Sequence, residues 1–156
     1  MIALPGAETE LRQLLQSVKF TNPTAVTLTM KKRAGSQVAD PINASGNFRH
    51  FRNRLDHAVL GSRAKRYGVR LVMIVVLETS ADQRLHYHCI IDRPYHCSFD
   101  KFGGIIREQW LKTDFGYREV DVQDQPDLGW TDYILKQRQK GSLLDSIDWA
   151  NCHLDC

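Results

Sequence analysis

The chain has 156 residues, of which 42% are hydrophobic and 25% charged, so it is long enough to bury the core of one compact domain and short for two. Its formal charge of +3 is unevenly distributed, because residues 1–80 hold 12 Lys and Arg against 5 Asp and Glu, whereas residues 81–156 hold 9 against 13. Neither an apolar run of the roughly 18 residues that a membrane helix needs nor a secretory signal layout occurs, so we expect a soluble, cytoplasmic protein with no membrane partner.

The first half of the chain predicts a helix, a strand and a long helix. Leucines at helical spacing behind a capping threonine predict a short helix over Thr9–Val18. The β-branched run Thr24–Met30 follows a proline and predicts a first strand, and the turn-forming residues 36–45 predict a loop. From Ser45 to about Tyr67, apolar residues recur at spacings of three and four, which is typical of an amphipathic helix.

The second half predicts three strands and two helices. Val69–Glu78 is apolar at odd and even positions, which indicates a central strand covered on both faces. A short polar segment joins it to a strand over Arg84–Asp92, so the two should form a hairpin. A helix over Ser98–Lys112, a strand over Tyr117–Gln123 and a helix over Asp127–Lys140 follow.

This order of elements predicts an α+β fold. It follows the split βαβ (ferredoxin-like) plan, in which helices pack on an antiparallel sheet. We therefore expect residues 1–22 to form an N-terminal helical extension, residues 23–140 the main domain and residues 141–156 a C-terminal tail.

Two histidines lie one residue apart in the second strand of the predicted hairpin. Since the side-chain period of a strand is two, His86 and His88 project from one face. With the turn centred near Asp82, Glu78 lies opposite His86, so that the three side chains can converge. Two imidazoles and one carboxylate suit a divalent ion such as Mg²⁺ or Mn²⁺ that also holds a phosphate oxygen. The alternatives are hydrogen-bonded sheet histidines and a glutamate that only ends its strand.

A tyrosine and a lysine share one face of the last predicted helix. Tyr133 and Lys136 are three residues apart, and a neighbouring ammonium can lower the pKa of a tyrosine hydroxyl or neutralise a scissile phosphate. The same spacing also occurs on ordinary surface helices. No other tyrosine has a lysine three residues later, and core or rim packing is expected for Tyr67, Tyr87, Tyr95 and Tyr117.

Taken in order, these motifs resemble a class of nuclease. The first-strand motif VTLTM, then HYHCII with a glutamate eight residues before its first histidine, then YILK, is similar to the nuclease domain of single-tyrosine rolling-circle replication initiators. These belong to the His-hydrophobic-His endonuclease superfamily, and the resemblance covers residues 24–140, so it makes 23–140 the nuclease domain.

The resemblance implies a chemistry for each motif. Glu78, His86 and His88 would hold Mn²⁺ or Mg²⁺, which polarises a phosphodiester in single-stranded DNA. Tyr133 would attack it, leaving a 5′-phosphotyrosyl link and a free 3′-hydroxyl that primes replication, and Lys136 would assist the tyrosine or the phosphate. The same site could rejoin strands without ATP.

The resemblance also implies partners. The substrate would be the replication origin of a plasmid, phage or related mobile element in a prokaryotic cell, cut by a monomer. No phosphate-binding loop of the G-x-x-x-x-G-K type occurs, so a separate host or partner helicase would unwind the DNA. Basic clusters with aromatics between them suit a phosphate backbone, although each alone also fits a solvated helix face. The expected DNA contacts are Thr27, Thr29, Lys31, Lys32, Arg33, Arg49 and Arg52.

Two alternatives remain open. Single-tyrosine transposases share the histidine motif and a later helical tyrosine, but they are usually domain-exchanged dimers. The second is a non-catalytic basic DNA-binding module in which the histidines bind structural zinc. Separately, CHLDC at Cys152–Cys156 could supply part of a zinc site if Cys97 and His96 approach. Four unevenly placed cysteines do not predict a disulfide scaffold.

Overall fold

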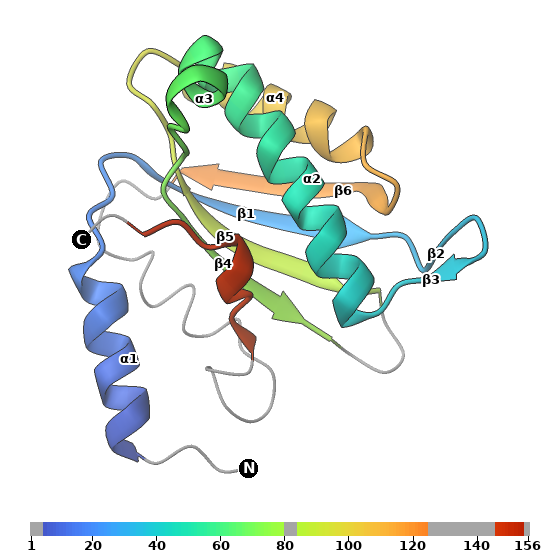
Figure 1. Ribbon diagram of the computed structural model, residues 1–156, viewed down its shortest axis with the longest axis horizontal. Coiled ribbons are helices and arrows are strands. Elements are labelled where there is room, and N and C mark those ends of the chain that lie inside the picture. The colour runs from blue at the N-terminus through green and yellow to red at the C-terminus, as the bar shows by residue number, and fades with distance from the viewer. Residues whose placement is uncertain (1–4, 80–83, 125–145, 155–156) are drawn as a thin grey trace.

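The computed structural model describes residues 5–79, 84–124 and 146–154, and an antiparallel sheet lies at its centre (Figure 1). The sheet has the strand order β4-β5-β1-β6, and a two-residue hairpin of β2 with β3 projects beyond it. Its strands are β1 (Pro23–Met30), β4 (Met73–Glu78), β5 (His86–Asp92) and β6 (Gly116–Asp124), and the hairpin joins β2 (Arg33–Ala34) to β3 (Gln37–Val38). The helices are α1 (Pro5–Ser17), α2 (Pro41–Leu60), α3 (Ser62–Tyr67), α4 (Phe99–Leu111) and the 3₁₀ turn η1 (Trp149–Asn151).

Helices α2 and α4 begin at side-chain caps. Asp40 accepts a hydrogen bond from the backbone N–H of Asn43 at 2.7 Å, and Pro41 occupies the first turn of α2, where its missing N–H costs nothing. Ser98 caps α4 in the same way, by accepting from the N–H of Lys101 at 3.2 Å. Local sequence therefore sets where these helices start.

The α+β split βαβ arrangement expected from the sequence is confirmed, with helices packed on a four-stranded antiparallel sheet. The long helix expected up to Tyr67 is divided instead, because Gly61 adopts a φ of 61° and separates α2 from α3. The loop expected over residues 36–45 contains β3 and the first turn of α2. The helix expected over Asp127–Lys140 lies outside the described residues.

Each face of the sheet has its own apolar layer. On one face, Val26 and Leu28 of β1 pack with Phe48 and Phe51 of α2 and Trp110 of α4. The ring of Trp110 also donates a hydrogen bond to the carbonyl of Thr29 at 2.9 Å, which ties α4 to β1. We call this side the helix face.

The opposite face carries a smaller layer. Leu15 of α1 and Ile147 pack there with Ile74 and Val76 of β4 and Ile90 of β5. Val76 of this layer pairs with His88 of β5. We call this side the histidine face, because alternation along β5 from Ile90 places His88 and His86 on it.

β4 lies at the edge of the sheet and not at its centre, although it is buried as expected. Residues Ser146–Leu154, the C-terminal segment, run beside it through bridges that pair Met73 with His153 and Val76 with Ile147. The N–H of Asp148 donates to the carbonyl of Val75 at 2.9 Å. The continuous apolar sequence of β4 therefore belongs to an edge strand, and the C-terminal segment, which is distant in the sequence, covers its outer edge.

One end of the sheet gathers the predicted metal ligands and the first basic cluster. Because neighbouring strands are antiparallel, β1 and β4 end where β5 and β6 begin, next to the β2–β3 hairpin (Figure 1). We call this the His86 end. None of the described helices combines the length and the apolar character that crossing a membrane requires.

Candidate functional site

The strand register brings the predicted metal ligands together. Glu78 of β4 pairs with His86 of β5, as the position of the turn predicted. His86 and His88 project from the same face, with ring centroids 6.4 Å apart and ring planes 20° from parallel. On the other side of β5, Thr29 pairs with His86 and Thr27 with His88.

The contact between the predicted metal ligands is diagonal. Oε1 of Glu78 lies 3.5 Å from Nε2 of His88, which is two residues along β5 from His86, the direct partner of Glu78. The other ring nitrogen of His88, Nδ1, lies 3.3 Å from the hydroxyl of Thr27. The His88 imidazole is thus held from both sides, and Thr27 acts on the site through His88, a role that the sequence did not predict for it.

Burial keeps His88 neutral. Its side chain is 10% exposed, and the desolvation that follows lowers its pKa from 6.5, although the Glu78 carboxylate opposes the shift. His86 adds a smaller lowering. A neutral imidazole keeps a lone pair for a metal ion, so the environment favours the ligand form of His88 near neutral pH.

In the metal-free protein, we expect the Cε1–H resonance of His88 to titrate with a midpoint below 6.5. Replacing Glu78 by glutamine should lower this midpoint further, since it removes the charge that favours the imidazolium. As the pH falls, His88 becomes protonated in the unfolded chain before it does in the folded protein. The free energy of unfolding should therefore decrease as the pH drops below 6.5. Two-dimensional NMR checks the midpoint, and Glu108→Gln, on the surface of α4, is the control. A midpoint at or above 6.5 contradicts this account of the site.

The donor set fits a divalent ion. Two ligand atoms, each about 2.1 Å from one ion, can lie at nearly the separation seen between Glu78 and His88. The ring of His86 stands farther away, and as the side chains lie, no three His, Cys, Asp or Glu of the described residues group closely enough to hold a metal ion. The Glu78–His88 pair is thus formed, whereas His86 does not join it as the side chains lie.

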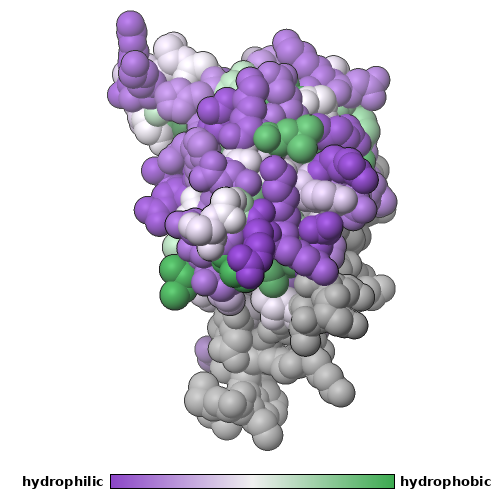
Figure 2. Space-filling view, turned by 90° about the vertical axis from the view of Figure 1, so that its right-hand side faces the viewer, coloured by the Kyte–Doolittle hydropathy of each residue, from purple (hydrophilic) through white to green (hydrophobic). Residues whose placement is uncertain are grey.

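The expected DNA contacts divide into two groups. Lys31, Lys32 and Arg33 are exposed directly after β1, at the His86 end, and Arg49 is exposed on α2. The side of the molecule from which the β2–β3 hairpin projects is predominantly hydrophilic (Figure 2). These four cations are therefore accessible to a phosphate backbone.

Three expected contacts are placed differently. Arg52 is only 4% exposed, because it lies on the side of α2 that meets the C-terminal segment, where it donates to the carbonyl of Ala150 at 3.4 Å. Thr29 is 3% exposed, and Thr27 contacts His88. As the side chains lie, Arg52 and Thr29 are therefore not presented on the surface, and their expected contacts with DNA stay predictions.

Tyr133 and Lys136, the expected nucleophile and its assistant, lie outside the described residues. Tyr87 packs on the helix face, as expected, and its hydroxyl donates to Asp148 at 2.9 Å. Burial raises its pKa, and Asp148 adds to the shift, so Tyr87 stays protonated and is unsuited to attack. The packing expected for Tyr67 and Tyr95 is not observed, since they are 76% and 90% exposed.

The cysteines do not form a zinc group within the described residues. The thiol of Cys152 contacts the N–H of Val75 at 3.4 Å, and burial raises its pKa to about 12, which disfavours the thiolate that zinc needs. A nitrogen of His96 lies 3.2 Å from the carbonyl of Val59. Cys89, Cys97 and Cys152 are free thiols, whereas Cys156 lies outside the described residues.

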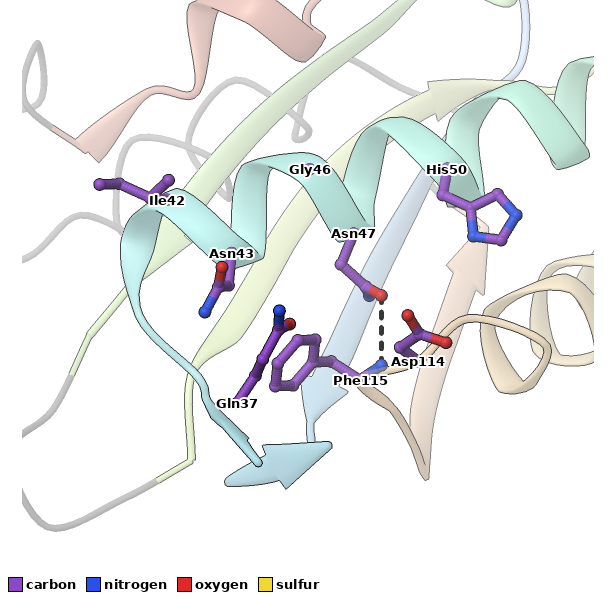
Figure 3. A pocket seen from close by; sticks show the side chains of 8 residues that line it. All are labelled: Gln37, Ile42, Asn43, Gly46, Asn47, His50, Asp114 and Phe115. Atoms are coloured by element: carbon purple, nitrogen blue, oxygen red, sulfur yellow. Dashed lines mark hydrogen bonds between the residues drawn. The ribbon is translucent and has the colours of Figure 1, made fainter. Parts of the chain in front are cut away.

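A cavity of about 250 Å³ lies on the helix face near the His86 end (Figure 3). The side chain of Asn47 in its wall connects α2 to the segment before β6. It donates a hydrogen bond to the hydroxyl of Thr113 at 3.2 Å and accepts one from the N–H of Phe115 at 3.1 Å. The carbonyl of Phe115 in turn accepts from the N–H of Lys31 at 2.7 Å. The cavity thus lies on the helix face, and the Glu78–His88 pair lies on the opposite face.

Comparison with protein-family models, with curated proteins and with solved structures finds no match to this chain.

Proposed function

We propose that the protein is a metal-dependent, site-specific endonuclease and strand transferase for single-stranded DNA, which initiates rolling-circle replication of a plasmid, phage or related mobile element. The observation that carries the proposal is the contact of Glu78 with His88 at 3.5 Å, beside His86 on the same face. Exposed cations at the same end of the sheet support a nucleic acid as the substrate.

The residues have distinct roles in this proposal. Glu78, His86 and His88 would hold Mn²⁺ or Mg²⁺, which when bound supplies Lewis-acid polarisation of the scissile phosphodiester. Thr27 fixes the orientation of the His88 ring through Nδ1. Lys136 would stabilise the negative charge that develops on the oxygen of Tyr133 or on the phosphate.

The attack exchanges one phosphodiester for another. The hydroxyl oxygen of Tyr133 forms a bond to phosphorus, the bond from phosphorus to the 3′-oxygen breaks, and the tyrosine proton passes to that oxygen. The products are a 5′-phosphotyrosyl link and a free 3′-hydroxyl. Because the number and type of phosphate ester bonds are unchanged, the reverse reaction rejoins strands without ATP.

The test is adduct formation on denaturing gels. The protein is incubated with single-stranded oligonucleotides that tile both strands of its own replicon, with Mn²⁺ or with a chelator. We expect a protein–DNA adduct that needs the metal and disappears in Tyr133→Phe, because only the nucleophilic oxygen is lost. Tyr95→Phe, at an exposed tyrosine beyond the far end of β5, is the matched control. A protein that binds these strands and forms no adduct on any of them is a binding module and not a nuclease.

A further inference from the structure

Two arginines lie against one tyrosine ring at the start of β6. The Cζ atom of Arg84 is 4.1 Å from the centroid of the Tyr117 ring, and that of Arg118 is 5.3 Å from it. Both distances are within the range of cation–π attraction. Tyr117 and Arg84 are half-buried, and Arg118 is exposed. The sequence did not indicate this cluster, because Arg84 and Tyr117 are far apart in the chain.

The cluster lies beside the candidate metal ligands. Leu85 packs against the layer on the helix face, and its carbonyl accepts from the N–H of Met30 at 2.9 Å. Strand alternation then turns Arg84 and His86, on either side of it, to the histidine face. Only β1 separates β5 from β6, so two strand spacings, about 10 Å in all, lie between the strand of the histidines and the strand of Tyr117.

The register of β6 places the tyrosine there. The register between β1 and β6 shifts between Leu28 and Met30, which pair with Val120 and Gly116. Leu28 and Met30 belong to the layer on the helix face, so strand alternation turns Tyr117, between their two partners, to the histidine face. Its ring meets Arg84 from the other side of β1.

Neither guanidinium of the cluster forms an ion pair with a carboxylate of the described residues. The ion pairs in this part of the chain join Glu78 to His88 and Glu108 to Lys112. Two cations held on an aromatic ring offer stacking for a base and charge for the phosphates beside it.

We propose that Arg84, Tyr117 and Arg118 form a nucleotide platform, on which a base of the single-stranded DNA stacks while its phosphates pair with the two guanidiniums. The proposal rests on the proposed function, since it takes single-stranded DNA as the substrate. The platform would hold a nucleotide close to the one whose phosphate reaches the metal ligands. Its residues bind and position the strand and do not take part in bond breaking.

The stacking part is tested by binding without catalysis. Fluorescence anisotropy with a labelled oligothymidylate, in the presence of a chelator, gives the affinity of each variant. Tyr117→Ala should weaken binding about 5- to 100-fold, the range found when one stacked base loses its aromatic partner. Tyr117→Phe keeps the ring and should stay within about twofold of the wild type. Tyr95→Ala removes an exposed tyrosine elsewhere and should change nothing.

The charge part is tested by salt dependence. Arg84→Ala and Arg118→Ala should each weaken binding and reduce the slope of log affinity against log salt by about 0.7, the value for one phosphate contact with a single strand. Arg63→Ala, at an exposed position on α3, is the control and should leave the slope unchanged. Since Arg118 is exposed, its loss does not threaten folding, and thermal unfolding of each variant verifies this.

Three results would overturn the platform. The first is wild-type affinity in Tyr117→Ala, and the second is an equal loss of affinity for duplex DNA, whose bases are already stacked. The third is a Tyr117→Phe variant that binds normally and forms no adduct, because the hydroxyl would then be the reacting group. Failure of the proposed function looks different: the wild type would form no adduct, while the effect of Tyr117→Ala on binding would persist.

Discussion

His88→Ala is expected to lower the rate of metal-dependent adduct formation by more than about 100-fold, since loss of an outer partner of a metal ligand alone costs about 10- to 100-fold. Glu78→Ala and His86→Ala should have effects of the same size. Affinity for single-stranded DNA in the presence of a chelator should stay within about twofold of the wild type, because these side chains serve the metal. The initial rate of adduct formation in Mn²⁺ is the measurement.

Two further variants sharpen this prediction. Thr27→Val keeps the shape of the side chain and removes the hydroxyl 3.3 Å from His88, so it should give a smaller loss of about 10- to 100-fold. Excess Mn²⁺ should restore part of that loss. His50→Ala removes an exposed histidine on α2 and serves as the control. Wild-type rates in His88→Ala would contradict the assignment of the site.

Gly116→Ala is expected to reduce the free energy of unfolding by about 1–3 kcal/mol or more. A Cβ atom at this position would overlap the carbonyl oxygen of Trp110 and would lie 2.8 Å from the hydroxyl of Thr113. The Trp110 carbonyl cannot move away easily, because it accepts hydrogen bonds from both the N–H and the hydroxyl of Thr113. The Trp110 ring is also held, since it donates a hydrogen bond to the carbonyl of Thr29. Chemical denaturation measures the change.

The matched control is Gly104→Ala. Gly104 is an exposed residue within α4, and a Cβ atom there would meet nothing within 4 Å. Alanine should therefore stabilise the protein by about 0.5–1 kcal/mol, because glycine loses more backbone freedom in a helix. If Gly116→Ala proved as stable as Gly104→Ala, the close packing of β6 against the end of α4 would be wrong.

The pairing of Glu78 with His86 could be predicted because it depends on local sequence. A short polar turn between two apolar runs fixes the register of a hairpin, and alternation then fixes which side chains share a face. The class of fold followed from the order of such elements. The three residues that were predicted as metal ligands therefore lie on adjacent strands, in the register that the sequence indicated.

Features that depend on distant contacts could not be predicted. Arg49 and Arg52 lie one turn apart on α2, and nothing local shows that the C-terminal segment covers only Arg52. The contact between Arg84 and Tyr117 depends on the pairing of β1 with both β5 and β6, whose register against β1 shifts next to Tyr117. The close approach of Gly116 to Trp110 likewise depends on how α4 meets β6.

The C-terminal segment has a consequence for the solubility of the chain. β4 reads MIVVLE, a run with high β propensity whose first five residues carry no charge, and such a run is prone to intermolecular association when its edge is open. The opposite edge strand, β6, carries Arg118, Glu119, Asp121 and Asp124, which discourage pairing with another chain. Ser146–Leu154 therefore protects the vulnerable edge, and a chain ending before Ser146 would expose it to self-assembly.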